Sequence, residues 1–401
     1  MEILTILTAF SWFSLSMLSG IIGVSVQQKF RPYVLPFVLF FAVLAFRNIS
    51  DRKFGLEGTE SYAMFLVIYM SHVTCVLCIE QYQLPNKSTT SIEWVRGYKL
   101  LSNPRWIGTT RQAADLRSNP TEEIEGESPS DGEDSTSISV DSSKQMRSFF
   151  RKPRAVFIRN RLISIFTIYA TLQAYNYMFY QVGPKYGVQL EMLDFLPNKL
   201  TYFRRISTVS LRETLVRAWL VFYWTFYSVG LYTAFHDFFA ILFVGSGVDK
   251  PEDWPPMFGS VTEATSIRNF WSRYWHRLVY RSYTSYGVWI TKNVLKLPRN
   301  SIVGKMFINL YVFAMSGAAH AIAVRQLGFS CGFWEEIRFY CSGFVGILLE
   351  TLILAAFKKL TGGYKVNATV SKTLGYVWVF TYLFITLPKS QYPKLWCQPT
   401  A

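Results

Sequence analysis

Long apolar runs dominate this sequence and restrict the folds that it can adopt. Eight runs approach the length of about 20 apolar residues that a helix needs to cross a bilayer. Because backbone N–H and C=O groups find no water in lipid, such runs must form helices or barrel strands. None of them alternates strictly between apolar and polar residues, so we predict helices. The runs are 3–26, 31–47, 60–80, 160–180, 214–244, 301–324, 336–357 and 370–388.

The composition agrees with an all-α integral membrane protein. Half of the residues are hydrophobic and only 17% are charged, whereas a soluble domain has about a quarter of its residues charged. We therefore predict a polytopic protein with about eight transmembrane helices. The first run follows directly on Met1-Glu2 and lacks the basic start of a cleaved signal peptide, so we interpret it as a retained anchor.

The net charge of +15 would suit a nucleic-acid-binding protein, but its distribution argues against that class. Three connections between the runs, 147–161, 268–299 and 358–372, are rich in Lys and Arg and contain no acidic residue. With eight spans these connections fall on one side of the membrane. The positive-inside rule makes that side cytosolic and places both termini on the other side. We predict contact with membrane lipid and no nucleic-acid partner.

The chain divides into three predicted parts. Residues 1–80 hold the N-terminal transmembrane helices, 81–158 form a cytosolic loop, and 159–401 form the membrane core. Within the loop, segment 118–143 has eight acidic residues and no Lys or Arg, a composition typical of disorder. A glycosylation sequon begins at Asn48, on the predicted lumenal side.

The five cysteines predict neither a metal centre nor a set of disulfides. Cys75 and Cys78 share a face of an apolar helix, without the second pair of ligands that a zinc site needs. Cys331, Cys341 and Cys397 are scattered along the chain, and their spacing shows no disulfide framework.

A first candidate site lies in the stretch SIRNFWSRYWHRLVYRSY, residues 266–283. Its large apolar residues recur at helical spacing and predict a helix with one apolar face, which leaves His276 with two arginines on the opposite face. An interfacial helix with an aromatic belt would give the same pattern. The apolar face comprises Phe270, Trp271, Tyr274, Trp275 and Leu278; the polar face comprises Asn269, Arg273, His276, Arg277 and Tyr280.

A second candidate site lies in the sixth run, where His320 is placed about two thirds of the way across. An ionisable side chain at that depth is costly and is by default a functional candidate, although a packing histidine is the alternative. Helical spacing puts Asn309, Phe313 and Ser316 on its face. The small residues Gly317, Ala318 and Ala319 would let a ligand or a neighbouring helix come close.

These two motifs carry a resemblance to a known family. MFGSVTEATSIRNFWSRYWH and FAMSGAAHA resemble the wax synthase-like branch of the membrane-bound O-acyltransferases, whose members carry an FW…WH segment before a helix with an SGxxH-type histidine. More specifically, the chain resembles fungal acetyltransferases that act on terpenoid and meroterpenoid natural products. The segment NPRWIGT, residues 103–109, also resembles a family segment, with Trp106 where glycine is usual. The resemblance covers about residues 94–325.

The resemblance implies an acyl-CoA-dependent O-acyltransferase in which 159–401 is the acyltransferase core. It implies no bound cofactor, acetyl-CoA as co-substrate, and a lipophilic alcohol as acceptor. His320 matches the catalytic position and His276 the second histidine. A neutral imidazole is a suitable general base near pH 7. No cysteine adjoins either histidine, so we expect direct transfer without an acyl-enzyme. We also expect the protein to lie in the endoplasmic reticulum membrane.

Further site residues are expected around the two histidines. Guanidinium groups on the predicted cytosolic side suit the phosphates of coenzyme A, although ordinary positive-inside charge explains them equally well. The expected substrate-binding residues are Asn309, Ser316, Trp271 and Trp275, and the expected coenzyme-binding residues are Arg268, Arg273, Arg277 and Arg281.

Three alternatives stay open at this point. Within the same chemistry, the chain would be a wax ester synthase that uses long acyl donors and fatty alcohols. A proton-coupled transporter would use the intramembrane His, Asp and Glu residues as a relay, although no repeat symmetry is evident. A scaffold would recruit partners through segment 118–143. The remaining ionisable residues of the spans, His72, His236, Asp237 and Glu350, are expected to be paired or packed rather than reactive.

Overall fold

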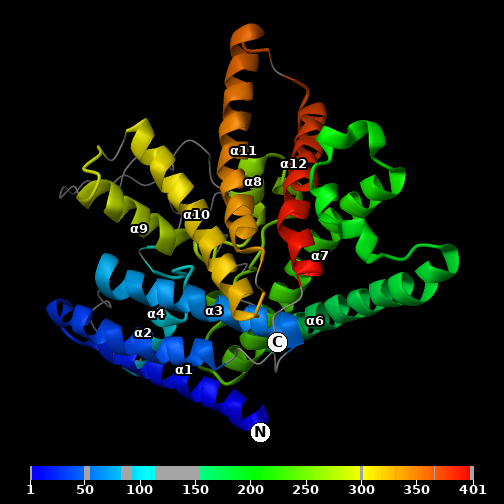
Figure 1. The fold of residues 1–401 in the computed structure, drawn as a ribbon. Coiled ribbons are helices and arrows are strands. Elements are labelled where there is room, and N and C mark those ends of the chain that lie inside the picture. Colours follow the sequence, from blue (N-terminus) through cyan, green and yellow to red (C-terminus); the bar gives the residue numbers. More distant parts are fainter. Residues whose placement is uncertain are drawn as a thin grey trace. The chain divides into compact units, whose positions relative to one another are not determined.

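The structure is a computed structural model that describes residues 2–48, 55–82, 93–109, 111–112, 154–298, 301–329, 331–364 and 366–397. Within these ranges all regular structure is helical, and eight helices are long and apolar enough to cross a membrane (Figure 1). This confirms the prediction of an all-α, multi-pass membrane protein. The acidic segment 118–143 and the sequon residues after Asn48 lie outside the described ranges.

The observed spans follow the predicted ones, with ends that differ by a few residues at most positions. The largest differences are at run 160–180, whose helix begins at Arg154 and continues through a π-helical turn, and at run 370–388, whose helix continues to Trp396. The spans are Leu7–Ser25, Gln28–Arg47, Gly58–Ile79, Arg154–Tyr186, Leu211–Gly245, Ile302–Gln326, Phe333–Leu360 and Ala368–Trp396.

The α-helices keep the labels of Figure 1. They are α1 (Glu2–Ser25), α2 (Arg31–Arg47), α3 (Gly55–Thr74), α4 (Glu93–Leu101), α6 (Arg154–Tyr177), α7 (Leu211–Gly245), α8 (Ile267–Asn269), α9 (Tyr280–Asn293), α10 (Ile302–Gln326), α11 (Phe333–Leu360) and α12 (Ala368–Trp396). Short 3-10 helices occupy much of the connection between α6 and α7.

Contacts group the chain into two compact units. The first unit comprises 1–106, 190–223 and 260–401, and the second comprises 107–189 and 224–259. Both units are therefore built from segments that are distant in sequence. The predicted parts 1–80, 81–158 and 159–401 were defined by their expected roles and not by contacts. That division stays a prediction.

Helix α10 is central to the first unit. It packs against α3, α9 and α11, and α11 packs in turn against α12 (Figure 1). A Cβ atom added to Gly317 would lie 2.7 Å from the Cα atom of Ile337, so α10 and α11 approach with no room for a side chain between them. On the neighbouring face, Ala319 and Ala323 pack against α3. The small residues beside His320 thus admit neighbouring helices, as the sequence predicts.

In the second unit, an ion pair accounts for Asp237, an acidic residue of α7. Arg161 Nη1 lies 2.8 Å from Asp237 Oδ1, and the same guanidinium donates to the carbonyl of Trp254. His236 Nδ1 lies 3.2 Å from the same carboxylate oxygen. Asp237 is fully buried, so its charge is compensated by a partner. This agrees with the expectation of a paired group.

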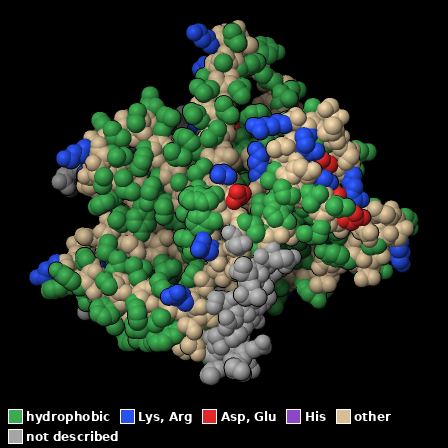
Figure 2. Space-filling view, viewed as in Figure 1, with side chains coloured by type: hydrophobic (Ala, Val, Ile, Leu, Met, Phe, Trp, Pro, Cys, Tyr) green, Lys and Arg blue, Asp and Glu red, His purple; other side chains and the backbone are tan. Residues whose placement is uncertain are grey.

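Large hydrophobic side chains point outward along the spans. Phe166, Phe222 and Leu354 are among many that are more than half exposed. Figure 2 shows hydrophobic side chains over most of the visible surface, with Lys and Arg at scattered positions. In water such a surface would favour aggregation, whereas lipid tails cover it without cost.

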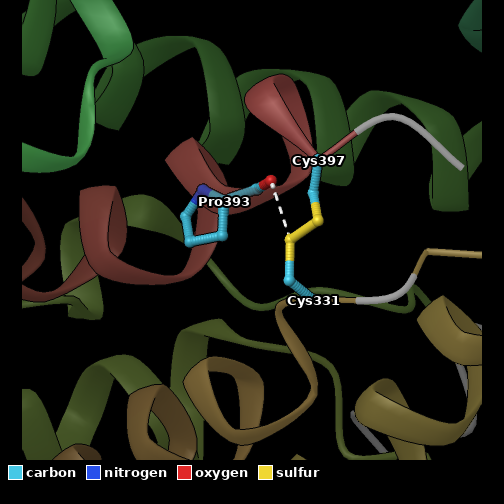
Figure 3. The surroundings of a disulfide bond; sticks show 3 residues. All are labelled: Cys331, Pro393 and Cys397. Carbon is cyan, nitrogen blue, oxygen red and sulfur yellow. Dashed lines mark hydrogen bonds between the residues drawn. A yellow bond between two sulfur atoms is a disulfide. The ribbon is translucent and has the colours of Figure 1, made fainter.

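A disulfide joins Cys331 to Cys397, which lie 66 positions apart in sequence and have Cα atoms 6.1 Å apart (Figure 3). Cys331 precedes α11, with its Sγ 3.8 Å from the carbonyl oxygen of Pro393, and Cys397 follows the last residue of α12. The spacing of the cysteines alone did not indicate this pair. Both residues fall on the side of the membrane that the charge distribution predicts to be lumenal, where disulfides persist.

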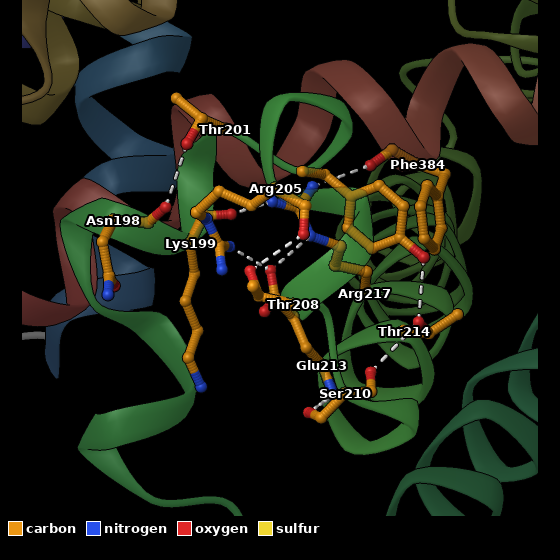
Figure 4. A network of polar contacts seen from close by, with 11 residues as sticks. Asn198, Lys199, Thr201, Arg205, Thr208, Ser210, Glu213, Thr214, Arg217 and Phe384 are labelled. Atoms are coloured by element: carbon orange, nitrogen blue, oxygen red, sulfur yellow. Dashed lines mark hydrogen bonds and ion pairs between the residues drawn. The ribbon is translucent and has the colours of Figure 1, made fainter.

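A polar network links arginines from the end of the α6–α7 connection and the start of α7 (Figure 4). Arg205 Nη2 lies 2.7 Å from Glu213 Oε1, and Arg217, which is fully buried, extends its guanidinium over the ring of Tyr202 at 4.8 Å. Arg212 pairs in the same way with Asp194. These arginines therefore form ion pairs within the protein.

Candidate functional site

The first motif begins as a helix but does not continue as one. Ser266 caps α8 by accepting a hydrogen bond from the N–H of Asn269, and the π-helical turn Phe270–Tyr274 follows. Trp275 is extended, with φ −69° and ψ 151°, and α9 starts only at Tyr280. The prediction of one continuous helix over 266–283 is therefore wrong. The break lets Trp275 fold back and stack on Phe270, with ring centroids 5.5 Å apart.

The aromatic residues of this motif form a cluster against α10 and α11. The ring centroid of Trp271 lies 5.9 Å from that of Phe313, with the rings nearly perpendicular, and 5.8 Å from that of Tyr340, with the rings tilted. Trp275 is 6% exposed. The predicted apolar face therefore packs against protein, and edge-to-face contacts of this kind hold the rings in defined orientations.

His276 lies in the irregular segment that follows the break. Its ring is 5.7 Å from that of Trp275, and the residue is partly buried. Burial, with smaller contributions from the neighbouring His320 and the positive charge of Arg105, lowers the pKa of His276 to about 3. The imidazole is therefore neutral at physiological pH, and one of its nitrogens is a hydrogen-bond donor.

His320 lies on the face of α10 that meets α11. Its ring stacks on Tyr340, with centroids 4.6 Å apart and an interplanar angle of 14°. His276 and His320 are close enough to interact electrostatically, although 44 residues separate them in sequence. The structure thus brings the two predicted histidines into one environment, lined by Trp275, Trp271 and Tyr340.

The polar residues expected on the face of His320 are less favourably placed. Ser316 Oγ donates to the carbonyl of Val312, 2.9 Å away, so its hydroxyl is turned back onto its own helix. Asn309 is exposed and lies about three turns from His320. Their assignment as substrate-binding residues stays a prediction.

The four arginines predicted to bind coenzyme A are spread over α8, the π-helical turn and the start of α9. Arg268 is exposed and donates to Thr351 Oγ1 at 3.2 Å. Arg277 lies over the ring of Tyr280, and Arg281 Nη2 is 3.5 Å from Glu80 Oε1. Arg273 is partly buried within the turn. Arg268 and Arg281 thus have polar partners in the protein, and the assignment of the four arginines to coenzyme A stays a prediction.

Trp106 occupies a position that the family resemblance had singled out. Its backbone has a φ of +57°, in the left-handed region that favours glycine, and glycine is the usual residue there. The indole is fully buried, in edge contact with His72 at 5.4 Å and Tyr82 at 5.2 Å. Burial of this large ring offsets the backbone strain. His72 Nε2 also contacts the carbonyl of Leu100 at 2.8 Å, as expected for a packing residue.

Sequence reasoning missed a buried polar cluster beside the site. Lys394 Nζ lies 2.8 Å from Glu336 Oε1, and Ser390 Oγ donates to the same oxygen at 2.8 Å. Glu60 lies 3.9 Å from the same ammonium. Lys394 is close enough to His320 for an electrostatic interaction. The sequence contains no spacing signal for this cluster, because its members come from α3, α11 and α12.

Comparison with known proteins places the two histidines in a recognised segment. Residues 254–342 match the family model described as "Membrane bound O-acyl transferase family", and both His276 and His320 lie within that range. No solved structure matches the chain.

Three curated relatives are named acetyltransferases. Acetyltransferase spyB of Aspergillus fumigatus is 32% identical over 161 residues, which are 37% of this chain and 27% of the relative. Acetyltransferase atnC of Arthrinium sp is 32% identical over 156 residues, 39% of this chain and 36% of the relative. Acetyltransferase aurG of Calcarisporium arbuscula is 30% identical over 207 residues, 50% of this chain and 49% of the relative.

The chain thus spans between about a quarter and a half of the length of these relatives. The matches confirm the resemblance to membrane-bound O-acyltransferases and to fungal acetyltransferases that the two histidine motifs indicated.

Proposed function

We propose that this chain is a membrane-bound O-acyltransferase that moves an acetyl group from acetyl-CoA to a hydroxyl of a lipophilic, terpenoid-like acceptor. The observation that carries the proposal is that His276 and His320 lie close enough to interact electrostatically, each beside an aromatic ring, within the segment that matches the family. The similar proteins are named acetyltransferases, which supports an acetyl donor.

His320 acts as the general base in this proposal. Its neutral imidazole takes the hydroxyl proton as the acceptor oxygen attacks the thioester carbonyl carbon. The carbon–sulfur bond then breaks, and the departing thiolate of coenzyme A receives that proton from the imidazolium. The products are an ester and free coenzyme A, with no acyl-enzyme intermediate and no net change in protons.

The negative charge that develops on the thioester oxygen needs a hydrogen-bond donor. His276 is the best placed of the three candidates, because it is neutral and lies close to His320. Ser316 bonds to its own helix and Asn309 is exposed, so each would have to reorient to reach that oxygen.

The coenzyme is proposed to enter from the cytosolic side, where its phosphates meet the arginines of segment 268–281. Arg281 would exchange Glu80 for a phosphate, and the resulting charge-assisted bonds are stronger than its present contact at 3.5 Å. The acceptor would enter from the membrane, and we propose an endoplasmic reticulum location.

Product mass spectrometry with microsomes tests the proposal. The wild type is expected to form acetyl ester from acetyl-CoA and a terpenoid alcohol, and His320→Ala is expected to lose at least about a hundredfold in rate at equal abundance. His72→Gln is the matched control, because a glutamine amide replaces the Nε2 contact to Leu100. Full turnover by His320→Ala would remove this residue from the mechanism.

A series of donor lengths separates the acetyltransferase from its closest rival. A strong preference for acetyl-CoA supports the proposal, and a preference for palmitoyl-CoA with fatty alcohols would instead support wax ester synthesis. Transport of the alcohol into vesicles without ester formation would favour the transporter.

A further inference from the structure

The buried cluster around Lys394 plays no part in the mechanism above, yet it lies beside the proposed base. Glu336 is 2% exposed and Ser390 is fully buried, and Glu336 Oε1 accepts from both the Ser390 hydroxyl and the Lys394 ammonium. A buried carboxylate is costly unless it is paired and hydrogen-bonded. The ammonium and the serine hydroxyl supply both, so this contact ties α12 to α11.

The tie connects to His320 through one turn of α11. Glu336 and Tyr340 are four residues apart, so they lie on one face of the helix about 6 Å apart along its axis. Tyr340 stacks on His320 at 4.6 Å. Between them, Ile337 touches α10 at Gly317, three residues before His320. The position of this turn of α11 therefore fixes the orientation of the His320 ring.

A second, covalent tie joins the same two helix ends. The Cys331–Cys397 disulfide links the residue two positions before α11 to the residue directly after α12 (Figure 3). Cys331 is five residues from Glu336, and Cys397 is three residues from Lys394. The ion pair and the disulfide thus act at the same end of the α11–α12 pair.

We infer that these two ties form a clamp in which Lys394 is a positioning residue for His320. Lys394 holds Glu336, Glu336 holds the first turns of α11, and Tyr340 on that helix keeps the imidazole in its reactive orientation. The inference rests on the proposed function of His320. It predicts that losing the clamp lowers kcat while leaving the binding of acetyl-CoA unchanged.

The experiment measures kcat and KM for acetyl-CoA per folded enzyme in four proteins: wild type, Lys394→Met, the Cys331→Ser/Cys397→Ser pair, and the combination. We expect Lys394→Met to lower kcat about tenfold with KM within about twofold, since displacements below 1 Å have effects of this size. The combination is expected to lose more than the product of the separate losses, because either tie partly substitutes for the other.

Two further variants separate positioning from simple stability. Lys394→Arg keeps the charge and is expected to recover kcat to within about threefold of wild type. Lys389→Met is the matched control, because Lys389 lies on the same helix and is exposed. Wild-type kcat in Lys394→Met, or independent losses in the combination, would overturn the clamp.

A readout without ester chemistry distinguishes this inference from the proposed function. Cys341 is a free, partly buried thiol directly after Tyr340. Its rate of maleimide labelling, followed by peptide mass spectrometry, is expected to rise at least about threefold in Lys394→Met and to stay unchanged in Lys389→Met. If the wild type makes no ester, the proposed function fails and this labelling still judges the clamp. An unchanged rate in Lys394→Met would refute it.

Discussion

Replacing Gly317 by alanine tests whether the close approach of α10 and α11 controls the geometry of His320. The added Cβ would lie 2.7 Å from Ile337 Cα and 3.2 Å from the carbonyl oxygen of Ile337, both of them backbone atoms. Backbone cannot rotate away as a side chain does, so one helix must move by several tenths of an ångström. Tyr340, one turn beyond this contact, would move with α11.

The expected magnitude follows from two opposing terms. Forcing a methyl group into a packed contact costs about 1 to 3 kcal/mol, and alanine returns up to about 1 kcal/mol through its higher helix propensity. The difference between the two terms is a net loss of up to about 3 kcal/mol in the free energy of unfolding. The rate is expected to fall further, by about tenfold to a hundredfold in kcat, because His320 moves relative to the bound substrates.

The assay combines thermal unfolding in detergent with kcat per folded enzyme. Gly230→Ala is the matched control, because that glycine also lies within a spanning helix but its Cβ would meet only the side chain of Ile168 at 3.4 Å. The control is expected to be as stable as wild type or slightly more stable, with unchanged kcat. If Gly317→Ala matched this control in both measurements, the argument from helix approach would be refuted.

Three other predictions concern stability. Burial lowers the pKa of His276 to about 3 from an unfolded value of about 6.5. The free energy of unfolding is therefore expected to fall as the pH drops below about 6.5, by up to about 1.4 kcal/mol per pH unit. Thermal unfolding of His276→Gln should show a smaller dependence on pH, and the same dependence as wild type would contradict this prediction. Breaking the disulfide by Cys331→Ser/Cys397→Ser should lower the thermal midpoint, with an upper limit of about 4 kcal/mol for a closed loop of 66 residues; a midpoint equal to wild type would show that the bond does not form. Trp106→Gly should relieve about 1 to 3 kcal/mol of backbone strain but remove about 3 to 5 kcal/mol of stabilisation from the buried indole. We therefore expect a less stable protein. A more stable variant would refute the conclusion that burial outweighs the strain.

Much of the architecture could be read from hydrophobicity alone. The requirement for about 20 apolar residues per span is strict, because unpaired backbone groups are so costly in lipid. The eight runs therefore predicted the eight long helices, including the short run 31–47 with its two prolines. Helix ends were less predictable, as for Arg154–Tyr186, since polar residues at the ends of a span cost little near the interface.

The two histidines were also identifiable from the sequence, each for a local reason. His320 stood out as an ionisable residue in an apolar run, and His276 as one of several polar residues among aromatics. Their neighbours were harder to place. Helical periodicity assumed that 266–283 is one helix, and the π-helical turn ending at Tyr274 invalidated the predicted faces beyond that point.

What the sequence determined by itself was therefore the helical membrane fold and the residues with candidate chemistry, because both depend on local hydrophobicity and residue type. Only the tertiary structure decided which of those residues meet. The stack of Tyr340 on His320, the disulfide of Cys331 with Cys397 and the ion pair of Glu336 with Lys394 all join separate elements of the chain. Such contacts arise from helix packing, and packing depends on the shape of every side chain along both helices rather than on any local pattern.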